Sequence, residues 1–330
     1  MQKHNNKRCS VCGRRMRRHG MTKAGTERYF CPVCKRAETE SRSDTRLRHN
    51  RDRFVDWLAG VESKSSVAKR YGVSARTLTR EFKTFASATD DPGNPPPSGL
   101  IARILIADAK FIDGNRLCAL VALTEADAIF WQFAPGENEG TWTLFMQRFA
   151  PPLVVVADGE KGLARFVKRF WPTTRFQRCH FHMVKLVIRY TTRDPKDEPS
   201  KDIFELALCL KTVKTKAQRD QWVMRYRIWE KMHASYFKQK SPAGGYAYRK
   251  LRSVRYAFKV ALPDLFTCLD IEGCPNTTND VEGWINAAIA EKIARHRGMK
   301  PKEKKVLVST VLSHLTRGKP KRKSSPEKHT

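Results

Sequence analysis

Short apolar runs from Leu100 onward follow the pattern of β-strands and predict strands at 101–107, 117–123, 128–133, 153–157 and 175–178. The run at 153–157, Leu-Val-Val-Val-Ala, has no polar interruption and is typical of a strand buried on both faces. Helical spacing predicts helices at 141–149 and 160–170 between these strands.

The pattern turns helical from Met183 to about Leu269, where Trp222, Tyr226 and Trp229 recur at helical spacing. Three antiparallel strands, then a helix, a strand and a helix, form the order expected of an RNase H-like α/β core. We therefore predict an α/β fold of this kind with an all-helical insertion at about 190–275.

Residues ahead of this core differ from it in character. The stretch Asp90-Asp91-Pro92-Gly93-Asn94-Pro95-Pro96-Pro97-Ser98-Gly99 cannot continue a helix and indicates a domain boundary. The predicted domains are a cysteine-containing ribbon at 1–45, a helix-turn-helix at 50–87, a linker at 88–99, a catalytic domain at 100–317 and a basic disordered tail at 318–330.

The chain carries 64 Lys and Arg against 33 Asp and Glu, which gives a formal charge of +31. A polyanion relieves such self-repulsion, and nucleic acid is the usual one, although a ribosomal or membrane-surface protein has a similar balance. No apolar stretch approaches the roughly 20 residues that span a bilayer, and the N-terminus has no apolar signal core. We expect a cytoplasmic protein whose nine cysteines bind metal or are buried.

Cys9-x2-Cys12 and Cys31-x2-Cys34 are two CxxC pairs at a distance that lets four thiolates surround one Zn²⁺. A segment this short has little core, so a structural Zn²⁺ is expected to supply much of its folding energy. Arg14 and Arg15 lie between the pairs and give the ribbon a surface for phosphates. A redox role is the weaker alternative, because one pair would suffice for it.

Residues 66–80 have the helix, glycine turn, helix layout of a helix-turn-helix. Gly72 can take the positive φ of the turn, and Ser74 can cap the second helix. Arg76, Thr77 and Arg80 are then predicted to face the major groove of double-stranded DNA. An unrelated helical hairpin with a solvated basic face is the alternative.

Asp108 ends the first apolar run and Asp158 ends the strongest one. A carboxylate just past each of two adjacent strands would bring both groups to one edge of the sheet. Two clustered carboxylates repel each other, and a divalent cation relieves that repulsion. A single Asp before a Gly is also an ordinary turn residue, so the prediction depends on the pair.

A third carboxylate would complete the arrangement that holds two ions in phosphoryl-transfer sites. The candidate is Glu282, in a segment where Thr277 or Thr278 can cap a helix. Asp280 competes for the same role.

These residues occur in an ordered set. Asp108-Ala109-Lys110-Phe111, Asp158-Gly159, Arg178-Cys179-His180-Phe181-His182, Thr277-Thr278-Asn279-x2-Glu282 and His296-Arg297-Gly298-Met299 follow one another along the chain. The set resembles the Mutator superfamily of DDE transposases over roughly residues 100–300, and most of all its prokaryotic insertion-sequence branch.

The resemblance implies an RNase H-like fold with a helical insertion before the glutamate. It also implies catalysis by Asp108, Asp158 and Glu282 with Mg²⁺ or Mn²⁺, which would cut at terminal inverted repeats and join the ends to target DNA. A homo-oligomer, at least a dimer on DNA, and a nucleoid-associated location in a prokaryote follow from the same resemblance. An RNase H-like nuclease or resolvase and a domesticated non-catalytic regulator stay open as alternatives.

Two further motifs have no assigned chemistry. Cys179 and His182 match the C-x-x-H motif of this superfamily, and we predict that they position the active site or DNA; a buried Cys and a core His would look the same. His296 and Arg297 are candidates for a phosphate contact, and a solvated basic helix end explains them equally well.

Overall fold

The computed structural model describes residues 7–9, 14–39, 52–89 and 91–318. The chain divides into two compact units, the first ending at Ala88 and the second beginning at Thr89. Within the described residues, no helix is both long and apolar enough to cross a membrane.

The first unit begins with an antiparallel three-stranded sheet in the order β1-β2-β3. Its strands are β1 (Arg17–Met21), β2 (Glu27–Cys31) and β3 (Arg36–Thr39). Four side chains, Cys9, Met16, Tyr29 and Cys31, form its small buried core. So few apolar residues provide little hydrophobic stabilisation, and the cysteines lie at the centre of this core.

A helical segment follows in the same unit, with a helix over residues 52–58, then α2 (Lys64–Arg70) and α3 (Ala75–Ala88). Gly72 takes a φ of +63° in the turn between α2 and α3. The hydroxyl of Ser74 accepts a hydrogen bond from the backbone N–H of Thr77 at 3.0 Å. Both details of the predicted turn and cap are therefore confirmed. Phe54, Leu58 and Leu78 are buried.

The second unit is a mixed α/β structure around a five-stranded sheet in the order β6-β5-β4-β7-β8. Its strands are β4 (Ile104–Phe111), β5 (Cys118–Thr124), β6 (Ile129–Ala134), β7 (Val154–Ala157) and β8 (Arg175–Arg178). The first three pair antiparallel, whereas β7 runs parallel to both β4 and β8. All five lie within a few residues of the predicted runs.

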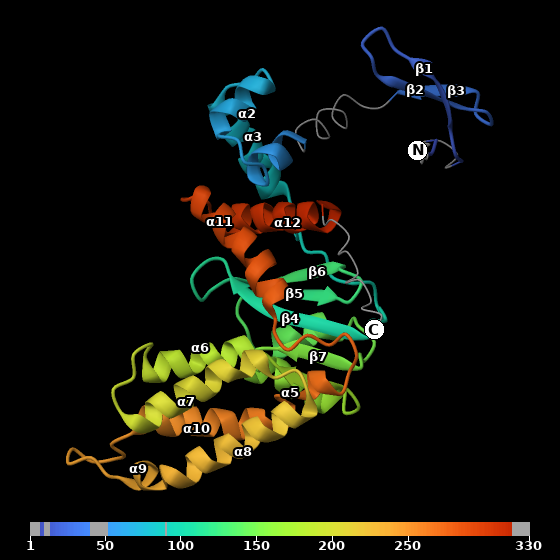
Figure 1. Ribbon diagram of the computed structural model, residues 1–330. Coiled ribbons are helices and arrows are strands. Elements are labelled where there is room, and N and C mark those ends of the chain that lie inside the picture. The colour runs from blue at the N-terminus through green and yellow to red at the C-terminus, as the bar shows by residue number, and fades with distance from the viewer. Residues whose placement is uncertain (1–6, 10–13, 40–51, 90, 319–330) are drawn as a thin grey trace, which may run out of the picture. The chain divides into compact units, whose positions relative to one another are not determined.

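Helices cover both faces of this sheet (Figure 1). Leu105 and Ala107 of β4 face one side, where they pack with α4 (Glu139–Met146) and α5 (Lys161–Phe170). Ile104 and Ile106 face the other side, where they pack with the C-terminal helices. Because both faces are buried, β5 is apolar up to Leu123 and β7 is apolar throughout.

The C-terminal helices are the π-helix η4 (Asp280–Asn286), α11 (Ala287–Arg295) and α12 (Pro301–Gly318). The prediction that Thr277 or Thr278 caps a helix is wrong. Asn279 is the residue before η4, and the hydroxyl of Thr278 instead donates to the sulfur of Cys179 at 3.4 Å. The predicted tail at 318–330 lies outside the described residues beyond Gly318.

The prediction that Asp108 lies just past a strand is also wrong, because β4 continues to Phe111. The parallel pairing of β4 with β7 ends at Ile106 and Val156, but the antiparallel pairing with β5 continues to Phe111. An apolar run marks only the part of a strand that is buried on both faces, so it ends earlier than the strand itself.

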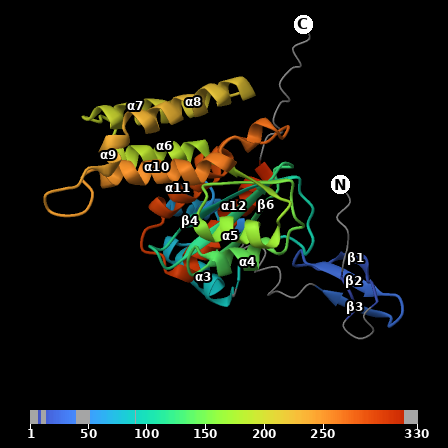
Figure 2. The same ribbon diagram turned by 90° about the horizontal axis from the view of Figure 1, so that it is seen from below.

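A helical block lies between β8 and η4. Its elements are α6 (His180–Thr191), α7 (Glu198–Leu208), η1 (Cys209–Thr212), α8 (Lys216–Met232), α9 (Ala234–Lys238), α10 (Arg249–Ala261), η2 (Leu262–Asp264) and η3 (Thr267–Leu269). It has its own core, in which Trp222, Tyr226 and Trp229 are buried. Both views show its long helices side by side and to one side of the sheet (Figures 1 and 2).

The segment predicted as a linker is not free of the second unit. Asn94 exchanges backbone hydrogen bonds with Trp131 of β6, at 2.9 and 3.1 Å. The carbonyl of Pro92 accepts hydrogen bonds from the indole of Trp131 and the hydroxyl of Ser309. The proline-rich stretch thus covers the β6 edge of the sheet, an edge that would otherwise expose unpaired backbone groups.

Strand β5, which lies between β6 and β4, gives a test of this packing. Leu120 is fully buried, whereas Leu153 before β7 is 46% exposed. We expect Leu120→Ala to lower the free energy of unfolding by about 2–5 kcal/mol. Leu153→Ala is the matched control and should change it by less than about 0.5 kcal/mol. Urea denaturation followed by circular dichroism measures both, and equal losses would contradict the two-sided burial of the sheet.

Candidate active site

Asp108, Asp158 and Glu282 line one cavity of about 320 Å³. Asp108 lies within β4, Asp158 follows the last residue of β7, and Glu282 lies in η4. Three segments that are far apart in the sequence therefore bring their carboxylates to a common space.

Strand alternation explains why the two aspartates share this space. Ile104 and Ile106 pair with Val154 and Val156 in parallel register, and all four side chains face η4 and α11. Two residues further on, Asp108 and Asp158 occupy the same level and the same face of the sheet. Since η4 packs on that face, Glu282 approaches both of them.

A tight turn fixes Asp158. Its carboxylate accepts a hydrogen bond from the backbone N–H of Glu160 at 2.7 Å, while Gly159 takes a φ of +79°. The guanidinium of Arg178 donates to the carbonyl of Gly159 at 2.6 Å. A Cβ on residue 159 would lie 1.3 Å from a nitrogen of Arg178. Only glycine allows this arginine to approach the backbone beside Asp158 so closely.

Two cationic side chains of α6 reach Glu282. Lys185 forms an ion pair with its Oε1 atom. The Nε2 atom of His182 lies 3.6 Å from its Oε2 atom, which is buried and has no hydrogen-bond partner among the described residues. Lys185 has no signal in the sequence other than its position three residues after His182, on the same face of α6.

Asn286 holds Asp108 from the end of η4. Its Nδ2 atom donates to Oδ2 of Asp108 at 2.5 Å, and its side chain lines the same cavity. Burial and the neighbouring charge of Asp158 raise the pKa of Asp108 to about 7. Asn286 was not predicted from the sequence, although its spacing of four residues from Glu282 is the spacing of one helix face.

A fourth acid, Glu137, also lines the cavity and was missed. It lies between β6 and α4 and accepts a hydrogen bond from the indole of Trp142 at 3.3 Å. Burial, together with the charges of Asp158, Glu160 and Asp108, raises the pKa of Glu137 to about 8. The signal for it was a carboxylate three residues past a strand end, much like Asp158.

Cys179 and His182 lie at the start of α6. Cys179 is fully buried, and its sulfur accepts hydrogen bonds from the N–H and hydroxyl of Thr278 at 3.3 and 3.4 Å. Burial alone would raise the pKa of Cys179, but hydrogen bonds with His182 and Thr278 lower it. Burial alone would lower the pKa of His182, but Cys179 and the charges of Asp158 and Glu282 raise it to about 8.

The donor set fits a divalent cation. Ligand atoms of Asp108, Asp158 and His182 all lie within 4.8 Å of one another. The buried Oε2 of Glu282 and Oδ1 of Asn286 have no hydrogen-bond partners among the described residues. Carboxylate and amide oxygens are the ligands that Mg²⁺ and Mn²⁺ prefer, and a cation would relieve the mutual repulsion of the acids.

Comparison with known families gives a match. Residues 124–237 match the family described as Transposase, Mutator family. The resemblance is thereby confirmed for this segment, and the match supports a transposase role. It includes Glu137, Asp158, Cys179 and His182, but it begins after Asp108 and ends before Glu282. A search of curated proteins finds no match.

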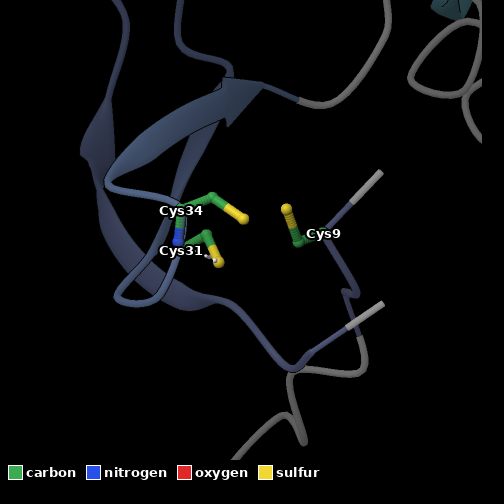
Figure 3. A group of neighbouring side chains, drawn as sticks. All are labelled: Cys9, Cys31 and Cys34. Atoms are coloured by element: carbon green, nitrogen blue, oxygen red, sulfur yellow. Dashed lines mark hydrogen bonds between the residues drawn. The ribbon is translucent and has the colours of Figure 1, made fainter. Parts of the chain in front are cut away.

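The ribbon ahead of the Mutator-matching segment can hold a structural metal. The sulfur atoms of Cys9, Cys31 and Cys34 lie within 4.8 Å of one another and point toward a common centre (Figure 3). Cys12, the fourth predicted ligand, lies outside the described residues. Arg14 and Arg15 lie on the exposed surface of the ribbon.

Of the three helix-turn-helix residues that are predicted to face DNA, two lie in one groove and one does not. Arg76 and Arg80 of α3 line an open groove with Lys64 and Lys83, two cations that the sequence analysis missed. Thr77 does not line this groove, and its hydroxyl lies 2.9 Å from that of Ser74.

His296 and Arg297 do not line the carboxylate cavity. They follow the last residue of α11, and the side chain of Arg297 donates to the carbonyl of Ala294 at 3.3 Å. Their predicted contact with a phosphate stays a prediction. Asp280, the competitor of Glu282, is likewise not among the residues that line the cavity.

The raised pKa of Glu137 predicts a pH-dependent stability in the metal-free protein. The pKa of Glu137 rises from its usual 4.5 in the unfolded state to about 8 in the folded state. Between these two pH values the folded state keeps a proton that the unfolded state has released. The contribution of Glu137 to the free energy of unfolding is therefore fully present below about pH 4.5 and is lost as the pH rises toward 8. Glu137→Gln removes this loss, so we expect its Tm at pH 8 to exceed that of the wild type by at least about 2 °C.

Thermal unfolding in EDTA at pH 5 and pH 8 measures the effect. Glu139→Gln is the matched control, because Glu139 lies outside the cavity and its ion pairs with Arg165 and Arg169 are long, at 3.9 and 3.8 Å. A gain for Glu137→Gln that is the same at both pH values would contradict the assignment.

Proposed function

We propose that this chain is a DNA transposase whose Asp108, Asp158 and Glu282 hold divalent cations for the cutting and joining of DNA phosphodiesters. The observation that carries the proposal is the cavity that these three carboxylates line, next to a segment that matches Mutator-family transposases. A transposase of this family requires no covalent protein–DNA bond, and the cavity presents carboxylates rather than a serine or tyrosine nucleophile.

The fold agrees with this proposal. Three antiparallel strands followed by two parallel strands, in the order β6-β5-β4-β7-β8, have the arrangement of an RNase H-like core. We propose that the second unit is such a core and that the helical block before η4 is its insertion. We further propose the domains predicted from the sequence: a ribbon at 1–45, a helix-turn-helix at 50–87, a linker at 88–99, a catalytic domain at 100–317 and a tail at 318–330.

The residues that line the cavity would have different roles in the reaction. Mg²⁺ or Mn²⁺, when bound, would activate the attacking water or 3′-hydroxyl and stabilise the departing 3′ oxygen. Asp108, Asp158 and Glu282 would hold the bound cations. Lys110 and His182 line the same cavity and would attract the scissile phosphate. Lys185 orients Glu282 through their ion pair.

The DNA partners would be terminal inverted repeats and target DNA, bound through the basic groove of α3 and through the ribbon. Arg76, Arg80 and Lys83 lie on one face of α3 and would meet phosphates or base edges. The family resemblance further supports an oligomer, at least a dimer on DNA, and a nucleoid-associated location.

Removal of one carboxylate tests the chemistry. We expect Asp158→Asn to lower cleavage of a labelled inverted-repeat duplex and its joining to a plasmid by roughly 100-fold or more, since a cation ligand is lost. Binding to the duplex should stay within about 3-fold of the wild type, because α3 is untouched. Asp194→Asn is the control, as Asp194 is an exposed residue paired with Lys196.

The alternatives give different products in the same assay. Metal-dependent cleavage without joining would indicate a nuclease or resolvase, and binding without cleavage would indicate a regulator. Cleavage retained in Asp158→Asn would refute the assigned site.

A zinc measurement tests the ribbon, for which we propose Zn²⁺ bound by Cys9, Cys12, Cys31 and Cys34. Cys31→Ser should lose the Zn²⁺ of the purified chain and expose the ribbon to proteolysis, because the metal supplies its folding energy. Cys209→Ser is the control, since Cys209 lies in the helical block and belongs to no metal-binding group among the described residues. Equal zinc content in the two variants would contradict the proposal.

A further inference from the structure

Asn286 is the most buried polar residue that lines the carboxylate cavity. It is 5% exposed, it is the last residue of the π-helix η4, and it lies four positions after Glu282. Both side chains line the cavity from the same helix. Single π-helical turns are rare and occur frequently at functional sites.

The amide of Asn286 has a defined orientation. Its Nδ2 atom donates to Oδ2 of Asp108 at 2.5 Å. An ionised carboxylate can only accept from an amide N–H, so with Asp108 ionised the nitrogen faces Asp108 and the oxygen faces away from it. That oxygen, Oδ1, is buried and has no hydrogen-bond partner among the described residues. Buried amide oxygens are rarely left without a partner, and such an atom requires an explanation.

The other groups that line this cavity indicate which kind of ligand the oxygen can bind. Oε2 of Glu282 is a second buried acceptor without a hydrogen-bond partner among the described residues, and the carboxylates of Asp108 and Asp158 line the same cavity. A space with several oxygen acceptors attracts a cation. Hard divalent cations bind amide oxygens as well as carboxylates.

We propose that Asn286 belongs to the cation site in two ways: its Nδ2 holds Asp108 in position, and its Oδ1 binds the divalent cation directly or through one water. The inference rests on the proposed function, because it assumes that the carboxylates bind a cation. It goes beyond that function by adding a neutral ligand from the same helix as Glu282. A neutral oxygen adds coordination without adding to the repulsion among four acids.

Mn²⁺ binding to the full chain tests the inference without a DNA substrate. We expect Asn286→Ala to weaken Mn²⁺ binding by about 10-fold or more, which is the effect of losing a residue that supports a metal ligand. Electron paramagnetic resonance of free Mn²⁺ gives the dissociation constant. Circular dichroism checks that each variant is folded. Asn279→Ala is the matched control, because Asn279 is exposed at the start of the same helix and lies outside the cavity.

Asn286→Asp separates a ligand from a purely structural residue. Without metal, the new carboxylate faces Asp108 and should lower the Tm. With Mn²⁺, the Tm should rise more than in the wild type, and the affinity should be at least that of the wild type, since an oxygen still faces the cation. A loss of Tm that Mn²⁺ does not reverse, or an Asn286→Ala variant with wild-type affinity, would overturn the inference.

Asp158→Asn distinguishes this result from a failure of the proposed function. If the wild type binds no Mn²⁺, or if Asp158→Asn binds it as tightly as the wild type, the cavity is not the cation site and both proposals fail. If Asp158→Asn loses binding and Asn286→Ala keeps it, the inference about Asn286 alone fails.

Discussion

The parallel pairing of β4 with β7 is the constraint on which the rest of the site depends. Its register aligns Ile106 with Val156, and two residues later it brings Asp108 level with Asp158 on one face of the sheet. A slip of one residue in either strand would turn a carboxylate into the opposite face, toward α4 and α5. The apolar side chains of both strands prevent such a slip, because each already has a buried face to fill.

That same register explains how much of the site could be predicted from sequence. Apolar runs identify the strands, and acids at their ends identify Asp108 and Asp158. The true extent of β4 could not be predicted, because it depends on pairing with β5 after β7 has ended. Glu137 and Asn286 are a loop glutamate and a helix asparagine in the sequence. Their local signals, a carboxylate soon after a strand end and a spacing of four residues from Glu282, are common in proteins, and only tertiary packing makes these two residues part of the cavity.

The acidity of the cavity contrasts with a chain of net charge +31. Four acids share one small space, and the raised pKa values of Asp108 and Glu137 reflect that burial and repulsion. These carboxylates would repel a DNA phosphate, and cations between the two would relieve that repulsion. Under the proposed function, bound cations would therefore relieve repulsion within the protein and between protein and DNA, whereas the basic groove proposed to bind DNA on α3 would not need them.

The helical block must leave the sheet and return without misplacing Glu282. Its entry and exit are joined where Cys179 accepts two hydrogen bonds from Thr278 and the N–H of His180 donates to the carbonyl of Asn276 at 2.9 Å. Closing so long an excursion costs conformational entropy, and these contacts oppose that cost at its base.

The first helix of the block, α6, contacts both the core of the block and the carboxylate cavity. Met183, Val184 and Val187 pack into the core of the block, while His182 and Lys185 face Glu282. The inserted helices are therefore coupled to the carboxylate cavity through one helix. A shift of α6 would move His182 and Lys185 relative to Glu282. The helical block therefore helps to position the site.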